Sequence, residues 1–124
     1  MLVNCLFVGC GGFVGSVLRY LCSFFRLEGV PLPLATLGIN VVGSFAIMFI
    51  AGLAARSVPI NEQWMLFLRV GLCGGFTTFS TFSAETLGLF EQGEIPLGLL
   101  YVILSIALCV AAAYLGEMAS CLFE

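Results

Sequence analysis

Hydroxyl and aromatic side chains follow a pair of glycines in one apolar stretch, residues 71–83, with the sequence GLCGGFTTFSTFS. Hydroxyls are hydrogen-bond donors, and the edges of aromatic rings are partially positive. Phe79 and Phe82 lie about 60° apart on one helical face, and Ser80 and Thr81 stand between them in the sequence. This pattern could replace the water around a small anion. Packing in a helical core is the alternative explanation of such an aromatic pair.

The first half of the same stretch is poor helix sequence. Gly74 and Gly75 are soon followed by the β-branched Thr77 and Thr78, and each glycine costs about 1 kcal/mol relative to alanine in a helix. We therefore expect the helix to break near 74–77. Irregular backbone at membrane depth is tolerated only where it is buried in protein or lines a cavity, and its free carbonyls can hold a cation.

Two further stretches place side chains able to hydrogen-bond at i, i+4 and i+8, so that each trio shares one helical face. The trios are Thr36, Asn40 and Ser44, and Tyr101, Ser105 and Cys109. The amide of the asparagine has two donor hydrogens and one acceptor oxygen, which suits an anion that has lost its water. Hydrogen bonds between packed helices are the alternative role for both trios.

The charged residues inside apolar sequence include Arg19 and Glu85. A guanidinium inside a membrane span costs about 2.5–3.5 kcal/mol on insertion scales. Arg19 could extend its charge to the membrane surface, or it could stand at the mouth of an aqueous vestibule and attract anions. Glu85 could be protonated, hydrogen-bonded by hydroxyls, or near the interface, and the sequence leaves these three open.

The composition identifies the elements that must position these residues. The chain has 124 residues, is 61% hydrophobic and 9% charged, and lacks His, Lys and Asp, whereas soluble domains carry about 25% charged residues. Each of four apolar runs exceeds the roughly 20 residues that cross a bilayer. These runs are 2–25, 34–55, 64–90 and 97–121. We predict a single all-α domain of four transmembrane helices, and the uncharged start favours a permanent first helix over a signal peptide.

Small residues indicate close helix packing. Gly11 and Gly15 form a GxxxG pair, which lets two helix backbones touch, and Gly12 with Ser16 repeats the spacing. The six cysteines contain no CxxC pair, so we interpret them as packing residues and not as a metal site or a disulfide framework.

The distribution of the arginines does not favour either orientation in the membrane. Arg56 and Arg69 fall on one side of a four-span chain, and Arg19 and Arg26 on the other. Because orientation follows the excess of Lys and Arg, this balance favours dual topology, in which copies insert both ways and pair antiparallel. A single orientation set by weaker signals is the alternative.

Three sequence blocks together resemble the Fluc fluoride channels, also called CrcB proteins: GGFVGSVLRY (11–20), TLGINVVGSF (36–45) and GLCGGFTTFSTFS (71–83). The resemblance covers essentially the whole chain. It implies a passive fluoride-selective channel that exports fluoride from the cytoplasm across a bacterial-type inner membrane. It also implies an antiparallel homodimer with two pores and a structural sodium ion at the dimer interface.

The resemblance further assigns roles to individual residues. It implies Arg19 as the vestibule arginine, and Gly74 and Thr77 as the residues whose backbone carbonyls, two from each subunit, hold the sodium ion. Some relatives carry a hydroxyl where this chain has Cys109. The implied pore residues are Asn40, Phe79, Phe82, Ser80, Thr81, Tyr101 and Ser105.

Other classes of protein fit the sequence less well. A small proton-coupled multidrug exporter of dual topology would need a membrane-embedded carboxylate early in the chain, and the first two spans contain none. An accessory subunit without a pore would need only the GxxxG pairs and the hydroxyls. An enzyme is disfavoured because the chain has no His, no paired acids, and no serine or cysteine beside a base.

Overall fold

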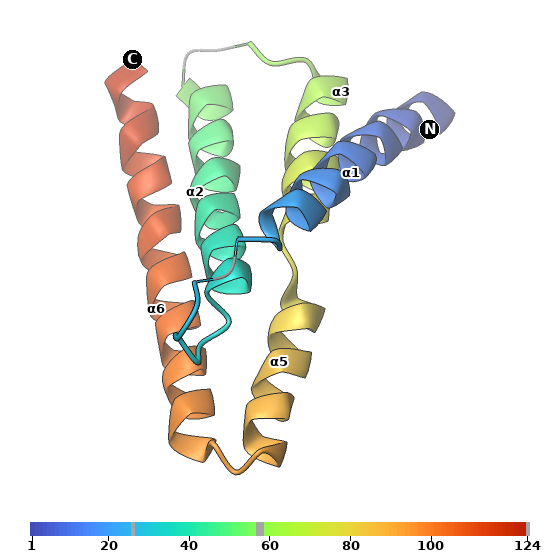
Figure 1. The fold of residues 1–124 in the computed structure, drawn as a ribbon. Helices are drawn as coiled ribbons and strands as arrows, with labels where there is room; N and C mark the ends of the chain where they lie inside the picture. The colour runs from blue at the N-terminus through green and yellow to red at the C-terminus, as the bar shows by residue number, and fades with distance from the viewer. Residues whose placement is uncertain (26, 57–58, 124) are drawn as a thin grey trace.

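The computed structural model describes residues 1–25, 27–56 and 59–123, and most of these residues lie in helices (Figure 1). Within these ranges, four helical segments are long and apolar enough to cross a membrane, as the sequence predicts. The elements are α1 (Leu2–Cys22), α2 (Leu34–Arg56), α3 (Glu62–Met65), the π-helix η1 (Leu66–Cys73), α4 (Gly74–Phe76), α5 (Phe79–Glu91), α6 (Ile95–Ser120) and the 3₁₀-helix η2 (Cys121–Phe123).

Local sequence explains where the helices end. α1 ends at Cys22, before the expected residue 25, and the hydroxyl of Ser23 donates a 2.6 Å bond to the Tyr20 carbonyl of the last turn. Asn61 starts the third segment by accepting a 2.8 Å bond from the Gln63 amide. Gly93, with φ of 81°, provides the left-handed turn between α5 and α6.

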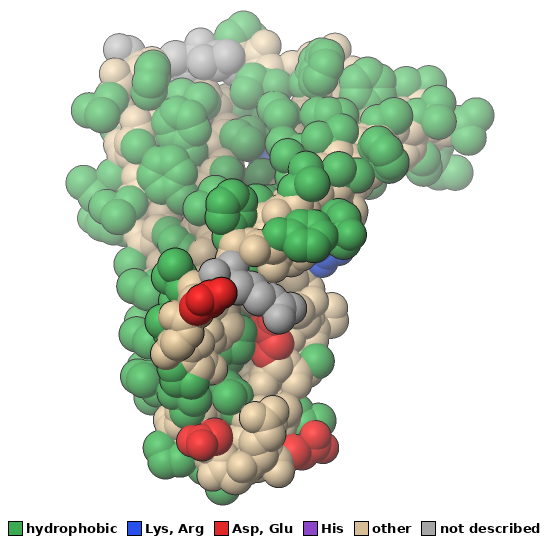
Figure 2. Space-filling view, viewed as in Figure 1, with side chains coloured by type: hydrophobic (Ala, Val, Ile, Leu, Met, Phe, Trp, Pro, Cys, Tyr) green, Lys and Arg blue, Asp and Glu red, His purple; other side chains and the backbone are tan. Residues whose placement is uncertain are grey.

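The two halves of the third segment have different partners: the first half packs on α1, and the second half, α5, packs on α6. α2 runs beside the C-terminal part of α6, and α5 packs beside the start of α6 (Figure 1). α1 crosses the first half of the third segment obliquely. Both chain ends lie toward the same end of the molecule. The surface is largely apolar (Figure 2), as expected for a protein in a bilayer.

Glycines allow the contact between α1 and the third segment. A Cβ at Gly11 would collide with the Phe67 carbonyl, and one at Gly71 would lie 2.8 Å from the Cα of Gly11. A Cβ at Gly75 would lie 2.7 Å from the Gly12 carbonyl oxygen. Gly71 and Gly75 are therefore a second GxxxG pair that faces the predicted one, a role that the sequence analysis did not assign to them.

The break in the third segment is confirmed, and it falls at Thr77 and Thr78. Gly74 is still helical (φ −65°, ψ −37°), whereas Thr77 (φ −78°, ψ 158°) and Thr78 (φ −152°, ψ 112°) are extended. The glycine pair does not itself unwind: Gly75 packs on α1, and the β-branched threonines adopt the extended backbone that suits them. The π-helix before the break had no signal in the sequence analysis.

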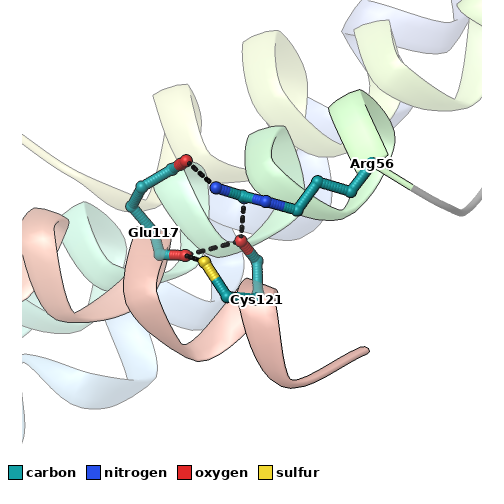
Figure 3. A network of polar contacts seen from close by, with 4 residues as sticks. Arg56, Glu117 and Cys121 are labelled. Atoms are coloured by element: carbon teal, nitrogen blue, oxygen red, sulfur yellow. Dashed lines mark hydrogen bonds and ion pairs between the residues drawn. The ribbon is translucent and has the colours of Figure 1, made fainter. Parts of the chain in front are cut away.

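The ends of α2 and α6 are joined by Arg56 (Figure 3). Its Nη2 lies 2.8 Å from Oε1 of Glu117, and its Nη1 donates a 2.7 Å bond to Oγ of the fully buried Ser120. Gly52 leaves room for both groups, because a Cβ there would collide with Oγ of Ser120. Arg56 is thus paired with a carboxylate within the chain.

Candidate functional site

The break is held from α2 by the side chain of Asn40. Its Nδ2 donates a 3.1 Å bond to the Thr78 carbonyl, and its Oδ1 accepts a 2.8 Å bond from the Thr78 amide. Asn40 therefore pairs with extended backbone as a neighbouring strand would, which satisfies both polar groups of a residue outside any helix. One hydrogen of its Nδ2 is not used by this pair.

The side chain of Thr78 begins α5. Its Oγ1 accepts a 3.2 Å bond from the Thr81 amide, which is the usual geometry of a helix N-cap. The same oxygen lies 3.0 Å from Oγ1 of Thr81 and 3.3 Å from Oγ of Ser80. The predicted pore hydroxyls of Ser80 and Thr81 are thus grouped around the cap.

These bonds remove the helical donors of two carbonyls. In an unbroken helix the Thr78 amide would bond to the Gly74 carbonyl, and the Thr81 amide to the Thr77 carbonyl. Here the first amide goes to Asn40 and the second to the Thr78 hydroxyl. Gly74 and Thr77 are the two residues predicted to offer carbonyls to a cation.

A cavity of about 390 Å³ lies beside the break. The rings of Phe79 and Phe82 are 5.5 Å apart and tilted by 44°, and Phe79 is 79% exposed. Ser105 is buried, and its Oγ has no hydrogen-bond partner among the described residues. The residues singled out in the sequence that line this cavity are Asn40, Ser44, Thr77, Phe79, Phe82, Ser105 and Cys109.

Tyr101, a predicted pore residue, does not line this cavity, and its hydroxyl binds Glu85 instead. Tyr101 is completely buried behind Phe82, with ring centroids 5.2 Å apart, and donates a 2.8 Å bond to Oε2 of Glu85. Thr36 donates a 2.8 Å bond to Oε1 of the same carboxyl group. Of the three alternatives left open for Glu85, the structure has the one in which hydroxyls bind it. Its partners lie on α2 and α6, and the sequence had no signal for this three-helix cluster.

Arg19 lines another cavity, of about 290 Å³, which also reaches the break. Thr36, Thr78 and Thr81 line it too, and Thr78 also lines the larger cavity. The predicted vestibule arginine and the predicted pore hydroxyl of Thr81 are therefore brought together. Thr78 is the residue that the two cavities share.

Comparison with known proteins agrees with the motifs. Residues 6–117 match the family described as CrcB-like protein, Camphor Resistance (CrcB). The chain belongs to the CrcB family. The resemblance seen in the three sequence blocks is thereby confirmed, and with four apolar helices this CrcB protein is a multi-pass integral membrane protein.

Relatives of this CrcB protein are similar over nearly their whole length. A protein of Ruminiclostridium cellulolyticum is 44% identical over 119 residues, which are 94% of this chain and 92% of the relative. A protein of Shewanella amazonensis is 45% identical over 92% of this chain and 93% of its own, and one of Chlorobaculum tepidum is 43% identical over 98% and 97%. All three are named fluoride-specific ion channel FluC.

Proposed function

We propose that this chain is a passive fluoride-selective channel that exports fluoride from the cytoplasm across a bacterial-type inner membrane. The observation that carries the proposal is the unpartnered, buried hydroxyl of Ser105 on a cavity that also holds the rings of Phe79 and Phe82. A buried donor without a partner is costly unless a ligand uses it. The names of the similar proteins supply fluoride as that ligand.

The broken helix favours an anion at this cavity. α5 begins at Phe79, and the first amides of a helix lack carbonyl partners and carry a partial positive charge. The second amide hydrogen of Asn40 and the hydroxyl of Ser105 add donors. Ring edges of Phe79 and Phe82 complete a surface that can replace the water of a small, strongly hydrated anion.

The second cavity provides an entrance. Arg19 and Thr81 line this cavity, and Thr78 lines both it and the phenylalanine cavity. Conduction requires several weak sites rather than one tight one, and two cavities in sequence meet that requirement. Such a leak needs no energy source, because the ion moves down its own gradient.

A second, antiparallel copy would complete each pore and give two pores per dimer. In one chain, Phe79 is 79% exposed although it lines the cavity, so one wall is missing. The two-against-two distribution of arginines gives neither orientation an advantage.

A structural sodium ion at the dimer interface belongs to the same proposal. The carbonyls of Gly74 and Thr77 have lost their helical donors, and backbone carbonyls freed at a helix break are the ligands that membrane proteins offer to sodium. Two carbonyls are too few to enclose a cation, so an equal pair from the second copy fits the set. The ion would supply positive charge that holds four carbonyls together.

Efflux from liposomes that contain only the purified protein tests the channel. We expect fluoride to leave and chloride to remain, and we expect Phe79→Ile, Phe82→Ile and Asn40→Ala to slow fluoride efflux. Phe123→Ile is the matched control, because Phe123 lies in η2 at the far end of α6. Chloride efflux as fast as fluoride efflux, or three pore variants as fast as the control, would contradict the proposal. Efflux of organic cations driven by a proton gradient would indicate a multidrug exporter instead.

A further inference from the structure

We infer that Asn40 and the hydroxyl of Thr78 are positioning residues that create the cation site, by diverting the two amide hydrogens that would otherwise occupy its carbonyls. The inference rests on the sodium ion of the proposed function. It gives Asn40 a second role in addition to that of a pore donor, and it assigns to Thr78 a role that the family resemblance did not.

Asn40 acts on the Gly74 carbonyl. Its Oδ1 accepts the Thr78 amide at 2.8 Å, and its Nδ2 fixes the Thr78 carbonyl at 3.1 Å, so that the peptide on each side of Thr78 is held extended. Without this pair, the Thr78 amide could return to the Gly74 carbonyl and continue the helix. Gly43 assists, since a Cβ there would collide with Cγ2 of Thr77.

The Thr78 hydroxyl acts on the Thr77 carbonyl. It accepts the Thr81 amide at 3.2 Å, which is the donor that a continuous helix would give to Thr77. The cap thus starts α5 at Phe79, two residues beyond Thr77, and leaves the Thr77 carbonyl available.

The neighbouring Cys73 carbonyl is an internal reference. It already accepts the Thr77 amide at 3.0 Å and the Thr77 hydroxyl at 2.9 Å, so both of its lone pairs are used. A cation at the break should therefore contact the carbonyls of Gly74 and Thr77 and leave that of Cys73 alone.

The first measurement uses the unaltered protein. Carbonyl carbons labelled with ¹³C at Cys73, Gly74 and Thr77 are observed by NMR while sodium replaces N-methylglucamine. We expect the signals of Gly74 and Thr77 to move with one sodium midpoint and that of Cys73 to stay. If no signal moves and the melting temperature does not depend on sodium, the sodium part of the proposed function fails. If Cys73 moves as much as Thr77, the inference is overturned while sodium binding stands.

Variants then test the two diverting groups. Thr78→Val removes the cap but keeps the β-branch, and Asn40→Leu removes both the acceptor and the donor that hold Thr78. We expect each variant to weaken the sodium midpoint by at least about tenfold, the effect of one lost hydrogen bond. Thr78→Ser restores the cap and should bind sodium like the original chain. If both Thr78→Val and Asn40→Leu keep the sodium midpoint of the unaltered protein, the inference is overturned, while the proposed channel function still stands. If these two variants do not fold, the carbonyl signals of the unaltered protein decide.

Discussion

The hydroxyl of Tyr101 donates a 2.8 Å hydrogen bond to Oε2 of Glu85, and this bond joins α6 to α5 beside the phenylalanine cavity. Tyr101 is completely buried, and its ring lies against Phe82. The bond therefore helps to fix the position of a ring that lines the proposed pore.

Tyr101→Phe should lower the free energy of unfolding by about 1 kcal/mol, within the range for hydrogen bonds in membranes. The ring is retained, so the loss measures the bond to Glu85. Tyr114→Phe is the control, because Tyr114 is 65% exposed on the same helix. Equal unfolding free energies for the two variants in a denaturant titration would show that the Glu85 bond does not stabilise the fold.

Gly11→Ala should destabilise the protein by about 1–3 kcal/mol, the usual cost of overpacking. The new methyl group would meet the Phe67 carbonyl, and backbone atoms cannot move aside as a flexible side chain can. Gly9→Ala on the same helix has open space around it and should be neutral or stabilising by up to about 1 kcal/mol. If both alanines lower the melting temperature equally, α1 does not pack on the third segment through Gly11.

Gly43→Ala should impair both stability and fluoride efflux, because its methyl group would collide with Cγ2 of Thr77 at the break. Thr77→Ser removes that methyl group and keeps the hydroxyl that bonds to the Cys73 carbonyl. The double variant should therefore recover most of the loss. A double variant that is as impaired as Gly43→Ala alone, in melting temperature and in efflux, would refute the contact.

The sequence predicts the parts of this molecule that depend on local pattern. Long apolar runs give the four helices, and the Gly-Gly-Phe-Thr-Thr sequence gives the break. The exact position of the break depends on contacts between helices. Gly75 is helical and packs against Gly12, and Thr78 is extended because its amide bonds to Asn40.

The functional residues divide in the same way. Phe79, Phe82, Asn40 and Ser105 share a cavity, as their spacing and the family resemblance indicate. Partners that lie far apart in the sequence were not predictable: Thr36 and Tyr101 meet at Glu85 from two other helices.

The central claim, that the cavity at the break conducts fluoride, is tested most directly at Ser105. Its hydroxyl has no partner among the described residues, so Ser105→Ala should leave the free energy of unfolding unchanged or raise it. Fluoride efflux should fall by about tenfold, because a hydrogen bond to a charged group contributes about 1.5–3 kcal/mol. Ser120→Ala is the opposite control: its buried hydroxyl is bonded to Arg56, so stability should fall. A Ser105→Ala protein that is as stable as the original and passes fluoride equally fast would contradict the account.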